Sequence, residues 1–566
     1  MAEYFSPGVY VEEYDNSPRS IEGVGTSTAG FIGLAEKGPV SGPPAFVPNF
    51  KSFTQQFGGF LSEFAYGEYR FLANSVEQFF ANGGTRCFVM RVAPKDAKTS
   101  SATKGLLTVT AKNPGVWGDK VQVSLTTVKK QKLQLVEKTE TGYKAKNADG
   151  FREGDIVEFE GTYTTIKTIM DRIITFTDEL PDEVVDDAII PKALLYLVTF
   201  DMQVRYGDEA ERYQELSFNV ASPRYIGSKL AGSELVDISV KPMEKPGNPV
   251  EAILGEDVES GAFFLEGGSD GSVSKVDAGT FIGEDNGPGK RTGLQSFIEN
   301  NNVSMLAVPG ITTPEVIVSL VGHCENLKNR FAVIDMPADM YKTADLIGYR
   351  SMIDSTYAAM YHPWIEVFDR SSNKSDYIPP SGAVMGIYSR TDQTRGVHKA
   401  PANEVVFCTG LKTNYTKDEQ DMLNPEGINL IRALPGQGIR IWGARTASSN
   451  AAFKYVNVRR LFIYVEESIK ANTNWVVFEP NDATLWQRVE LSISGFLDGL
   501  WRNGMLAGDS PSTSYFVEIG PSTMTRDDIN NGRLICNIGI APSRPAEFVI
   551  FRVTQFTAEA GGSEEG

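Results

Sequence analysis

The segments VSMLAV at 303–308, PEVIVSLVGHCENLKN at 314–329 and FAVID at 331–335 decide the fold class of this chain. The first and third are short apolar runs typical of buried strands, while the second begins with a proline and has the length of a helix. A strand, a helix and a strand in this order predict two parallel strands joined by a right-handed crossover. We therefore expect an α/β core with a mixed sheet.

The same pattern occurs near the start of the chain. GFIGLA at 30–35 is typical of a buried strand, and residues 85–92 predict another. Between them, a helix that ends at Asn82-Gly83-Gly84 is indicated by apolar residues at helical spacing, namely Tyr69, Leu72, Val76, Phe79 and Phe80. A further helix is expected at 343–357. We assign residues 21–95 together with 266–375 to one α/β core domain.

Residues 96–265 have a different sequence pattern. Short β-prone runs, such as LLTVTA at 106–111 and TYTTIKTI at 162–169, alternate with glycines, prolines and charges. This pattern predicts a β-rich domain, either a sandwich or a small barrel, inserted into the α/β core. Residues 131–191 are a possible nested subdomain.

Both ends of the chain contain strand-forming segments, at 7–13 and 547–553. A strand on a flexible arm can add to the sheet of another chain, because its backbone N–H and C=O groups are unpaired. Residues 1–20 lack helical periodicity and predict an extended arm. Residues 376–566 are assigned to a C-terminal domain, with strands at about 514–519, 533–540 and 547–556. Its best helix is 482–502, whose apolar stripe comprises Leu485, Val489, Ile493, Phe496, Leu497, Leu500 and Trp501.

Composition excludes several functional classes. The chain has 566 residues, 41% of them hydrophobic and 22% charged, which predicts a multidomain globular protein. A net charge of −18 argues against a general nucleic-acid-binding protein, because phosphate affinity needs clustered Lys and Arg. No apolar run approaches the roughly 20 residues that span a bilayer, so membrane insertion is not expected. The four cysteines have no CxxC spacing and predict free thiols.

No stretch of the sequence matches a catalytic or cofactor motif. GEDNGPGKR at 283–291 fails as a phosphate-binding loop, because Arg291 stands where Ser or Thr is required. His323, His362 and His398 form no HExxH pair, and no GxSxG motif supplies a nucleophile. We therefore expect no catalytic residue, metal ligand or cofactor. Arg445, Arg459 and Arg460 are expected to form ion pairs, either within the chain or between copies.

Several segments closely resemble the contractile tail sheath proteins of bacteriophage tails and phage-tail-like injection machines. They are SPGVYVEEYDNSPRSIEGVGTSTAGFIGLAEKGPV at 6–40, SVEQFFANGGTRCFVMRV at 75–92, IPPSGAVMGIYSRTD at 378–392, KYVNVRRLFIYVEESI at 454–469 and IGIAPSRPAEFVIF at 538–551. The resemblance is strong at both ends and in the middle third, and weak between about 96 and 264.

This resemblance implies a structural subunit that polymerises as stacked six-fold rings around an inner tube and contracts to drive the tube through a cell envelope. It also implies strand exchange between copies, with acceptor strands at 514–540 and a flexible segment at 15–22. The donated residues are Gly8, Val9, Tyr10, Val11 and Glu12 of the N-terminal arm and Glu547, Phe548, Val549, Ile550 and Phe551 of the C-terminal strand.

The implied partners are copies of the chain itself, the inner tube protein, and baseplate and terminator or cap proteins, with no direct nucleic-acid contact. Assembly is expected in the bacterial cytoplasm, as part of a phage tail or an injection particle. The exposed face of 482–502, with Arg488, Glu490 and Arg502, is the predicted tube-facing surface.

Two other functions were weighed. A receptor- or carbohydrate-binding tail component would need clustered aromatic residues and paired carboxylates in 96–265, where Trp117 is the only tryptophan. An enzyme built on the α/β core would use residues at strand ends such as Asp335, which lacks recognisable partners in the sequence.

Overall fold

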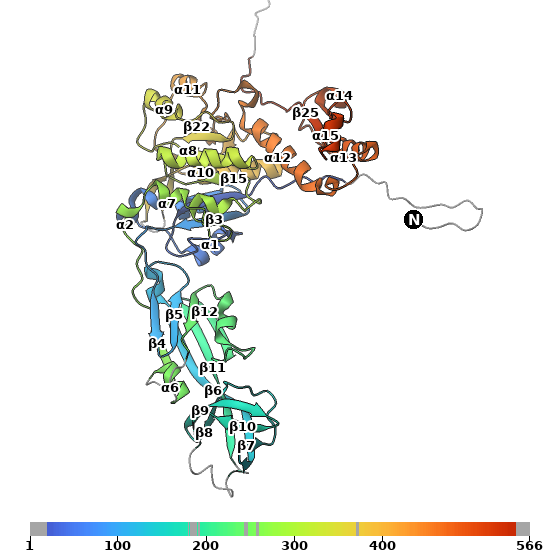
Figure 1. The fold of residues 1–566 in the computed structure, drawn as a ribbon. Helices are drawn as coiled ribbons and strands as arrows, with labels where there is room; N and C mark the ends of the chain where they lie inside the picture. Colours follow the sequence, from blue (N-terminus) through green and yellow to red (C-terminus); the bar gives the residue numbers. More distant parts are fainter. Residues whose placement is uncertain are drawn as a thin grey trace, which may run out of the picture.

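The computed structural model describes residues 20–178, 180, 190, 193–242, 247–255, 260–369 and 373–550. A central body carries a long β-rich insertion and a smaller C-terminal unit, which extend from the body in different directions (Figure 1). The predicted fold class, an α/β core with a mixed sheet and an inserted β-rich region, is confirmed.

The central body is built on a mixed sheet of nine strands. Its order is β2 (Ala45–Val47), β3 (Cys87–Val92), β1 (Ala29–Leu34), β15 (Met305–Ala307), β16 (Phe331–Asp335), β17 (Ala358–His362), β22 (Ile428–Leu434), β23 (Gly438–Ile441) and β20 (Glu404–Val405). The strands from β3 to β22 are parallel, and the two edges are antiparallel. The predicted crossover is confirmed, since β15 and β16 pair in parallel on either side of α8 (Pro314–Leu327).

Helices cover both faces of this sheet. Side chains of α1 (Phe50–Phe57), α3 (Leu72–Ala81) and α10 (Ser381–Arg395) share one buried cluster with Ala29 and Phe31. Side chains of α7 (Ala278–Ile282), α8, α9 (Thr343–Arg350) and α11 (Lys417–Leu423) share the other cluster with Ile32 and Leu34. Burial on both faces explains the continuously apolar strand sequences.

Two predictions about the core need correction. The helix expected at 343–357 ends at Arg350, because the Ser355 N–H donates to the Ala447 carbonyl and draws the chain into a turn. The boundary expected at residue 376 falls inside the central body. There, β22 extends the parallel sheet beside β17, and α10 packs on its face.

Two glycines allow α10 to approach α3 closely. A Cβ at Gly382 would lie 2.1 Å from the Ser75 backbone oxygen, and a Cβ at Gly386 would lie 2.4 Å from that of Phe79. These positions are four residues apart, so they lie on one side of the helix. Small residues at this spacing therefore bring the two helix backbones into contact.

The β-rich insertion contains a small barrel. One sheet has the order β12 (Glu209–Leu216), β11 (Leu194–Tyr206), β8 (Ile156–Phe159), β9 (Thr162–Met170), β10 (Ile173–Phe176), β7 (Gly142–Ala145), β6 (Gln122–Thr139) and β14 (Ser260–Phe264). An additional pairing of β11 with β6 closes the strands between them into a ring. The barrel, rather than the sandwich, is therefore formed.

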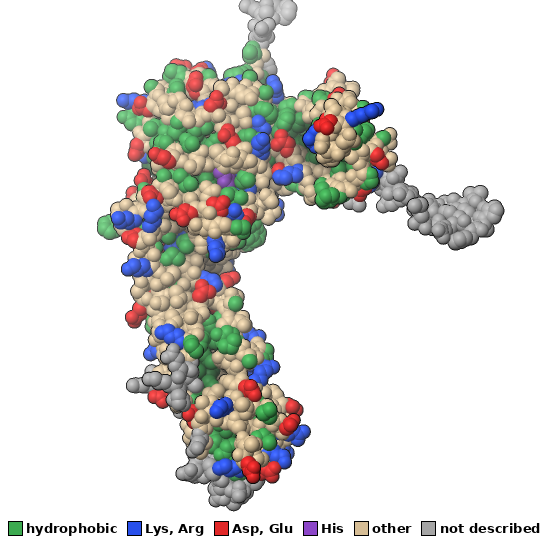
Figure 2. Space-filling model, in the orientation of Figure 1, with side chains coloured by type: hydrophobic (Ala, Val, Ile, Leu, Met, Phe, Trp, Pro, Cys, Tyr) green, Lys and Arg blue, Asp and Glu red, His purple; other side chains and the backbone are tan. Residues whose placement is uncertain are grey.

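The insertion has two apolar clusters rather than one. One includes Leu133, Phe159 and Ile174 of the barrel, and the other includes Trp117 and Phe200. A three-stranded sheet of β13 (Val236–Val240), β5 (Leu107–Ala111) and β4 (Ser101–Lys104) borders the second cluster. On the face shown in Figure 2, acidic and basic side chains are interspersed over the insertion.

The remaining elements are short or belong to the C-terminal unit. They are the sheet of β18 (Ile365–Asp369), β19 (Lys374–Ile378) and β21 (Gly410–Leu411), and the helices α2 (Glu63–Tyr66), α5 (Ile226–Lys229), α6 (Pro249–Leu254), α12 (Val456–Asn472), α13 (Ala483–Arg502), α14 (Pro511–Ser514) and α15 (Arg526–Asn530). The C-terminal unit consists of α12 to β25 (Cys536–Ile540) and includes β24 (Tyr515–Ile519). Its helix α13 confirms the prediction for 482–502.

We expect Gly382→Ala to lower the free energy of unfolding by about 1–3 kcal/mol, because the added methyl group overpacks the contact of α10 with α3. The matched control is Gly322→Ala in α8, where a Cβ meets nothing within 4 Å. This control should be neutral or stabilising by up to about 1 kcal/mol. Urea unfolding of both variants checks this expectation, and equal midpoints would contradict it.

Candidate subunit interface

The C-terminal unit contains a sheet of only two strands. β24 and β25 pair antiparallel from Tyr515 opposite Ile540 to Ile519 opposite Cys536. Within the described residues each strand pairs only with the other, so each has one open edge. Two strands are marginally stable alone and need a packing surface or further strands.

Helix α13 supplies the packing surface. Tyr515, Val517 and Ile519 alternate along β24 and, together with Ile538 and Ile540 of β25, lie against the apolar stripe of α13. The buried residues of that stripe are Leu485, Val489, Ile493, Leu497 and Leu500. The sheet is therefore held in place on one face while its edges stay open.

The outer face of this sheet is partly apolar. The Phe516 side chain is 53% exposed and lies over Gly539, where a Cβ would come within 2.1 Å of its ring. A donated strand at either edge would extend this face. The predicted acceptor strands at 514–540 thus form a sheet suited to accepting a further strand.

The chain leaves β25 as the C-terminal segment, residues 541–550. The Ala541 N–H donates to the Ser514 carbonyl, and the Asn457 side-chain amide donates to the Ser543 carbonyl. Residues 547–550, predicted as the start of a strand, are in no strand of this chain. Phe548, Val549 and Ile550 are 71%, 68% and 78% exposed. Phe551 lies outside the described residues.

Glu547 is bound by four side chains of the same chain. Arg445 holds both carboxylate oxygens, with Nε–Oε1 2.7 Å and Nη2–Oε2 2.8 Å, and is 7% exposed. Tyr455 and Asn424 each donate a hydrogen bond of 2.8 Å, and Lys454 lies 3.4 Å away. Burial alone would raise the pKa of Glu547, but the hydrogen bonds from Arg445, Asn424 and Tyr455 lower it to about 2.

The N-terminal segment, residues 20–28, runs along α12. The Asn472 side-chain amide donates to the Glu22 carbonyl at 2.9 Å, and the Val24 N–H donates to Ser468 Oγ at 3.1 Å. Arg460 donates to the Thr26 carbonyl at 3.0 Å. The predicted donor residues Gly8, Val9, Tyr10, Val11 and Glu12 lie outside the described residues, whereas the segment that leads to them is fixed on α12.

A buried ion pair joins α12 to the central body. Arg460 contacts both Asp392 oxygens, at 2.9 Å and 2.5 Å, and each side chain is 3% exposed. The Arg460 guanidinium also lies 4.7 Å from the Tyr388 ring centroid. Arg459 stacks on Phe453, with 3.6 Å between guanidinium carbon and ring centroid. Arg445 and Arg460 therefore form ion pairs within the chain, which is one of the two alternatives expected, whereas Arg459 forms, among the described residues, a stacking contact rather than an ion pair.

The predicted tube-facing residues do not share one side of α13. Arg488 is half-buried over the Trp475 ring, at 4.8 Å, and Arg502 pairs with Asp498 at 2.8 Å. Glu490 is exposed. Two positions correspond to about 200° around a helix, so Arg488 and Glu490 point to nearly opposite sides. Their contact with a tube stays a prediction.

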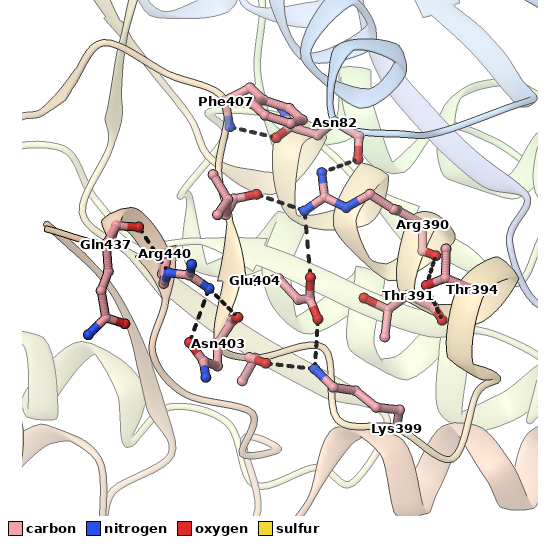
Figure 3. A network of polar contacts seen from close by, with 12 residues as sticks. Asn82, Arg390, Thr391, Thr394, Lys399, Asn403, Glu404, Phe407, Gln437 and Arg440 are labelled. Atoms are coloured by element: carbon pink, nitrogen blue, oxygen red, sulfur yellow. Dashed lines mark hydrogen bonds and ion pairs between the residues drawn. The ribbon is translucent and has the colours of Figure 1, made fainter. Parts of the chain in front are cut away.

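Figure 3 shows a polar network that attaches the edge strand β20 to α10. Glu404 accepts from Lys399 at 2.8 Å and lies 3.8 Å from Arg390. Arg390 donates to the carbonyls of Asn82 and Val405. The charges in this network satisfy one another, which indicates a structural role.

The candidate catalytic side chains are likewise occupied by internal contacts. Asp335 is buried and accepts hydrogen bonds from Ser381 N, Ser381 Oγ and Gly310 N. Burial raises its pKa to about 6, although these hydrogen bonds act in the opposite direction. These donors make Asp335 a support for the start of α10.

Two of the three histidines, His323 and His362, are buried in the central body. Burial, assisted by Arg330, lowers the pKa of His323 to about 3, and burial, assisted by Lys412, lowers that of His362 to about 4. His362 Nε2 lies 2.9 Å from the Tyr415 hydroxyl. These two rings are therefore neutral at pH 7.

Searches for metal and membrane sites give no candidate in the described part of the chain. There, no cluster of three or more His, Cys, Asp or Glu side chains is suited to hold a metal ion. Nor does any described helix combine the length and hydrophobicity needed to cross a bilayer.

Acid should release the C-terminal segment. The pKa of a free glutamate is near 4.5 and that of Glu547 is about 2. The contacts of the Glu547 carboxylate therefore stabilise the bound segment fully above pH 4.5, and this stabilisation is lost as the pH falls toward 2. The charged groups around it are Arg445 and Lys454. We expect pepsin cleavage beside Phe548 to accelerate over this window relative to Glu547→Gln, and a constant ratio would contradict the assignment. Circular dichroism checks that the chain stays folded.

Comparisons with known proteins agree with this architecture. The family model for the phage tail sheath protein central domain matches residues 287–447, and the model for the phage tail sheath C-terminal domain matches residues 448–556. The tail sheath protein of Escherichia phage P2 is 27% identical over 285 residues, which cover 48% of this chain and 69% of the phage protein. That of Burkholderia phage BcepMu is 25% identical over 308 residues, covering 50% and 63%.

Solved structures extend the similarity over nearly the whole fold. The contracted sheath complex of the extracellular contractile injection system PVC has a TM-score of 0.53 at 21% identity, covering 98% of this chain and 99% of that one. The sheath tail protein Lin1278 from Listeria innocua has a TM-score of 0.52 at 12% identity, covering 93% and 96%. With two adjacent sheath-domain models matched and the same fold over its length, the chain belongs to the phage tail sheath protein family.

Proposed function

We propose that this chain is the subunit of a contractile sheath, which polymerises around an inner tube and shortens to drive the tube through a target envelope. The observation that carries this proposal is the combination of a two-stranded sheet with open edges and an exposed apolar segment that begins eight residues beyond its last strand. In one copy, the sheet has an unpaired edge and the segment has no strand partner. The segment of one copy can therefore pair with the sheet edge of a second copy.

In the proposed mesh, two arms from different copies add to the sheet of β24 and β25 in a third copy. The donated residues are Gly8 to Glu12 of one copy and Glu547 to Phe551 of another, in which the Glu547 side chain stays bound to its own body at the start of the strand. A strand that forms about five backbone hydrogen bonds gains a few kcal/mol, at roughly 0.5–1.5 kcal/mol each, before ordering costs. One junction is weak, but repetition over many copies makes a stable array.

Contraction in this proposal needs no nucleotide. An extended array that is metastable can shorten by rotating whole bodies while the strand junctions stay paired. The energy then comes from folding and assembly, with the compact array burying more surface between central bodies. Satisfied contacts at Asp335 and in the network of Glu404 support a structural rather than catalytic central body.

The proposed orientation in the array uses the shape of the molecule. The β-rich insertion and the C-terminal unit leave the central body in different directions (Figure 1). If the C-terminal unit lies toward the tube, the insertion lies at the outside, where mixed surface charges suit contact with water (Figure 2). We propose six-fold rings, an inner tube protein, baseplate and terminator or cap proteins as partners, and assembly in the bacterial cytoplasm.

The alternative, a receptor- or carbohydrate-binding tail component, has no support from the comparisons. Trp117, the tryptophan of the insertion, is 5% exposed and packs edge-on against Tyr206 with 5.5 Å between ring centroids. It therefore serves the core of the insertion rather than a ligand platform.

Deletion of residues 1–16 should leave a folded, soluble subunit that no longer forms tubes, because one of the two donated strands is lost. Negative-stain electron microscopy of the purified protein, with inner tube protein added as a template, measures this. Deletion of residues 561–566 is the control and should leave tube formation unchanged. Normal contractile tubes from the first deletion would refute the proposed mesh.

Charge reversal on α13 tests the tube contact. Arg488→Glu, Glu490→Lys and Arg502→Glu together should reduce co-assembly with inner tube protein several-fold and leave sheath-only polymers intact. Lys144→Glu, in β7 of the insertion, is the control at an exposed ion pair. Co-sedimentation measures binding, and unchanged binding by the triple variant would remove these three residues from the proposal.

A further inference from the structure

The segments that lead to the two terminal arms are held at opposite ends of α12. Tyr455, the N-cap residue of α12, and Asn457 in its first turn hold the C-terminal segment. Ser468 and Asn472, in its last turn, hold the N-terminal segment. At 1.5 Å per residue, this helix of 17 residues separates the two sites by about 25 Å.

The helix itself is fixed to the central body. The buried pair of Arg460 with Asp392 lies between the two ends, and Arg459 is enclosed by the rings of Phe453 and Tyr357. Breaking such a buried pair would leave a charge without a partner, so α12 is held firmly. The distance between the starting points of the two arms is therefore set by a rigid element.

The C-terminal starting point depends on one side chain. Glu547 is the last described residue that forms a hydrogen bond or ion pair with the body, and the next three residues are largely exposed. The nearest upstream contacts of the segment are made by Ser543, whose carbonyl accepts from Asn457 and whose hydroxyl donates to the Gly504 carbonyl. Three residues, 544–546, therefore lie between two successive attachment points.

We propose that Glu547 is a positioning residue, which fixes the start of the C-terminal arm at one end of α12 and so sets the spacing at which further copies of this chain are joined. The partner is a second copy, whose open sheet edge receives the residues after Glu547. This inference rests on the proposed function, because it concerns how donated strands are spaced.

The spacing argument gives a measurable consequence. Without the Glu547 contacts, the arm would start at Ser543 and gain four residues, which reach up to about 13 Å at 3.3 Å per residue. Arms of variable reach no longer hold neighbouring copies at one distance. The tubes formed by such a variant should then be fewer and irregular in axial repeat.

Limited proteolysis of the soluble full-length subunit tests the contact itself. Chymotrypsin cleaves after Phe548, the first residue beyond the Glu547 contacts, and after Phe556, which serves as an internal reference. We expect Glu547→Gln to raise the rate of cleavage after Phe548 about tenfold relative to that after Phe556. Asp339→Asn is the matched control, since it removes a 96% exposed carboxylate paired with Lys412.

Electron microscopy of the same variants, assembled on inner tube protein, tests the spacing. If the Glu547→Gln variant is cleaved at the same relative rate as the wild-type chain, the anchoring role is overturned. Faster cleavage with tubes of unchanged number and axial repeat would overturn the positioning role. If the wild-type chain forms no tubes on the template, the proposed function fails instead, and the inference falls with it even where cleavage after Phe548 is accelerated.

Discussion

The ion pair between Arg460 and Asp392 is the contact on which the arrangement of this subunit depends. It is buried, it holds α12 against α10, and it also fixes the N-terminal segment through the Thr26 carbonyl. A buried pair is costly to form and costlier to break on one side, so it favours one geometry over others. The C-terminal unit and the starting points of both arms are placed through this helix.

The polar side chains of the molecule work mainly as supports. Asp335 holds the start of α10, Glu404 attaches an edge strand, and Glu547 is bound where the chain leaves the body. Each is satisfied by donors from distant parts of the chain. A contractile sheath subunit needs rigid bodies with defined points of exit, and these contacts supply both.

The interface combines elements of very different predictability. The strands β24 and β25 and the apolar stripe of α13 follow from local periodicity, and all were predicted near their observed positions. The donors to Glu547 lie 92 to 123 residues away from it, and no local pattern connects them. The boundary at residue 376 was wrong for a similar reason. Composition and local patterns do not specify the order of strands in a sheet or which helix covers it.

The sequence by itself determined the elements, the mixed α/β core, the β-rich insertion and the resemblance to tail sheath proteins, because apolar periodicity and turn residues act over a few positions. Only the tertiary structure decided that the insertion closes into a barrel, that Arg445 and Arg460 pair within the chain, and that both arms start from α12. These features depend on which segments meet across a hundred residues or more, and packing of the whole chain selects them.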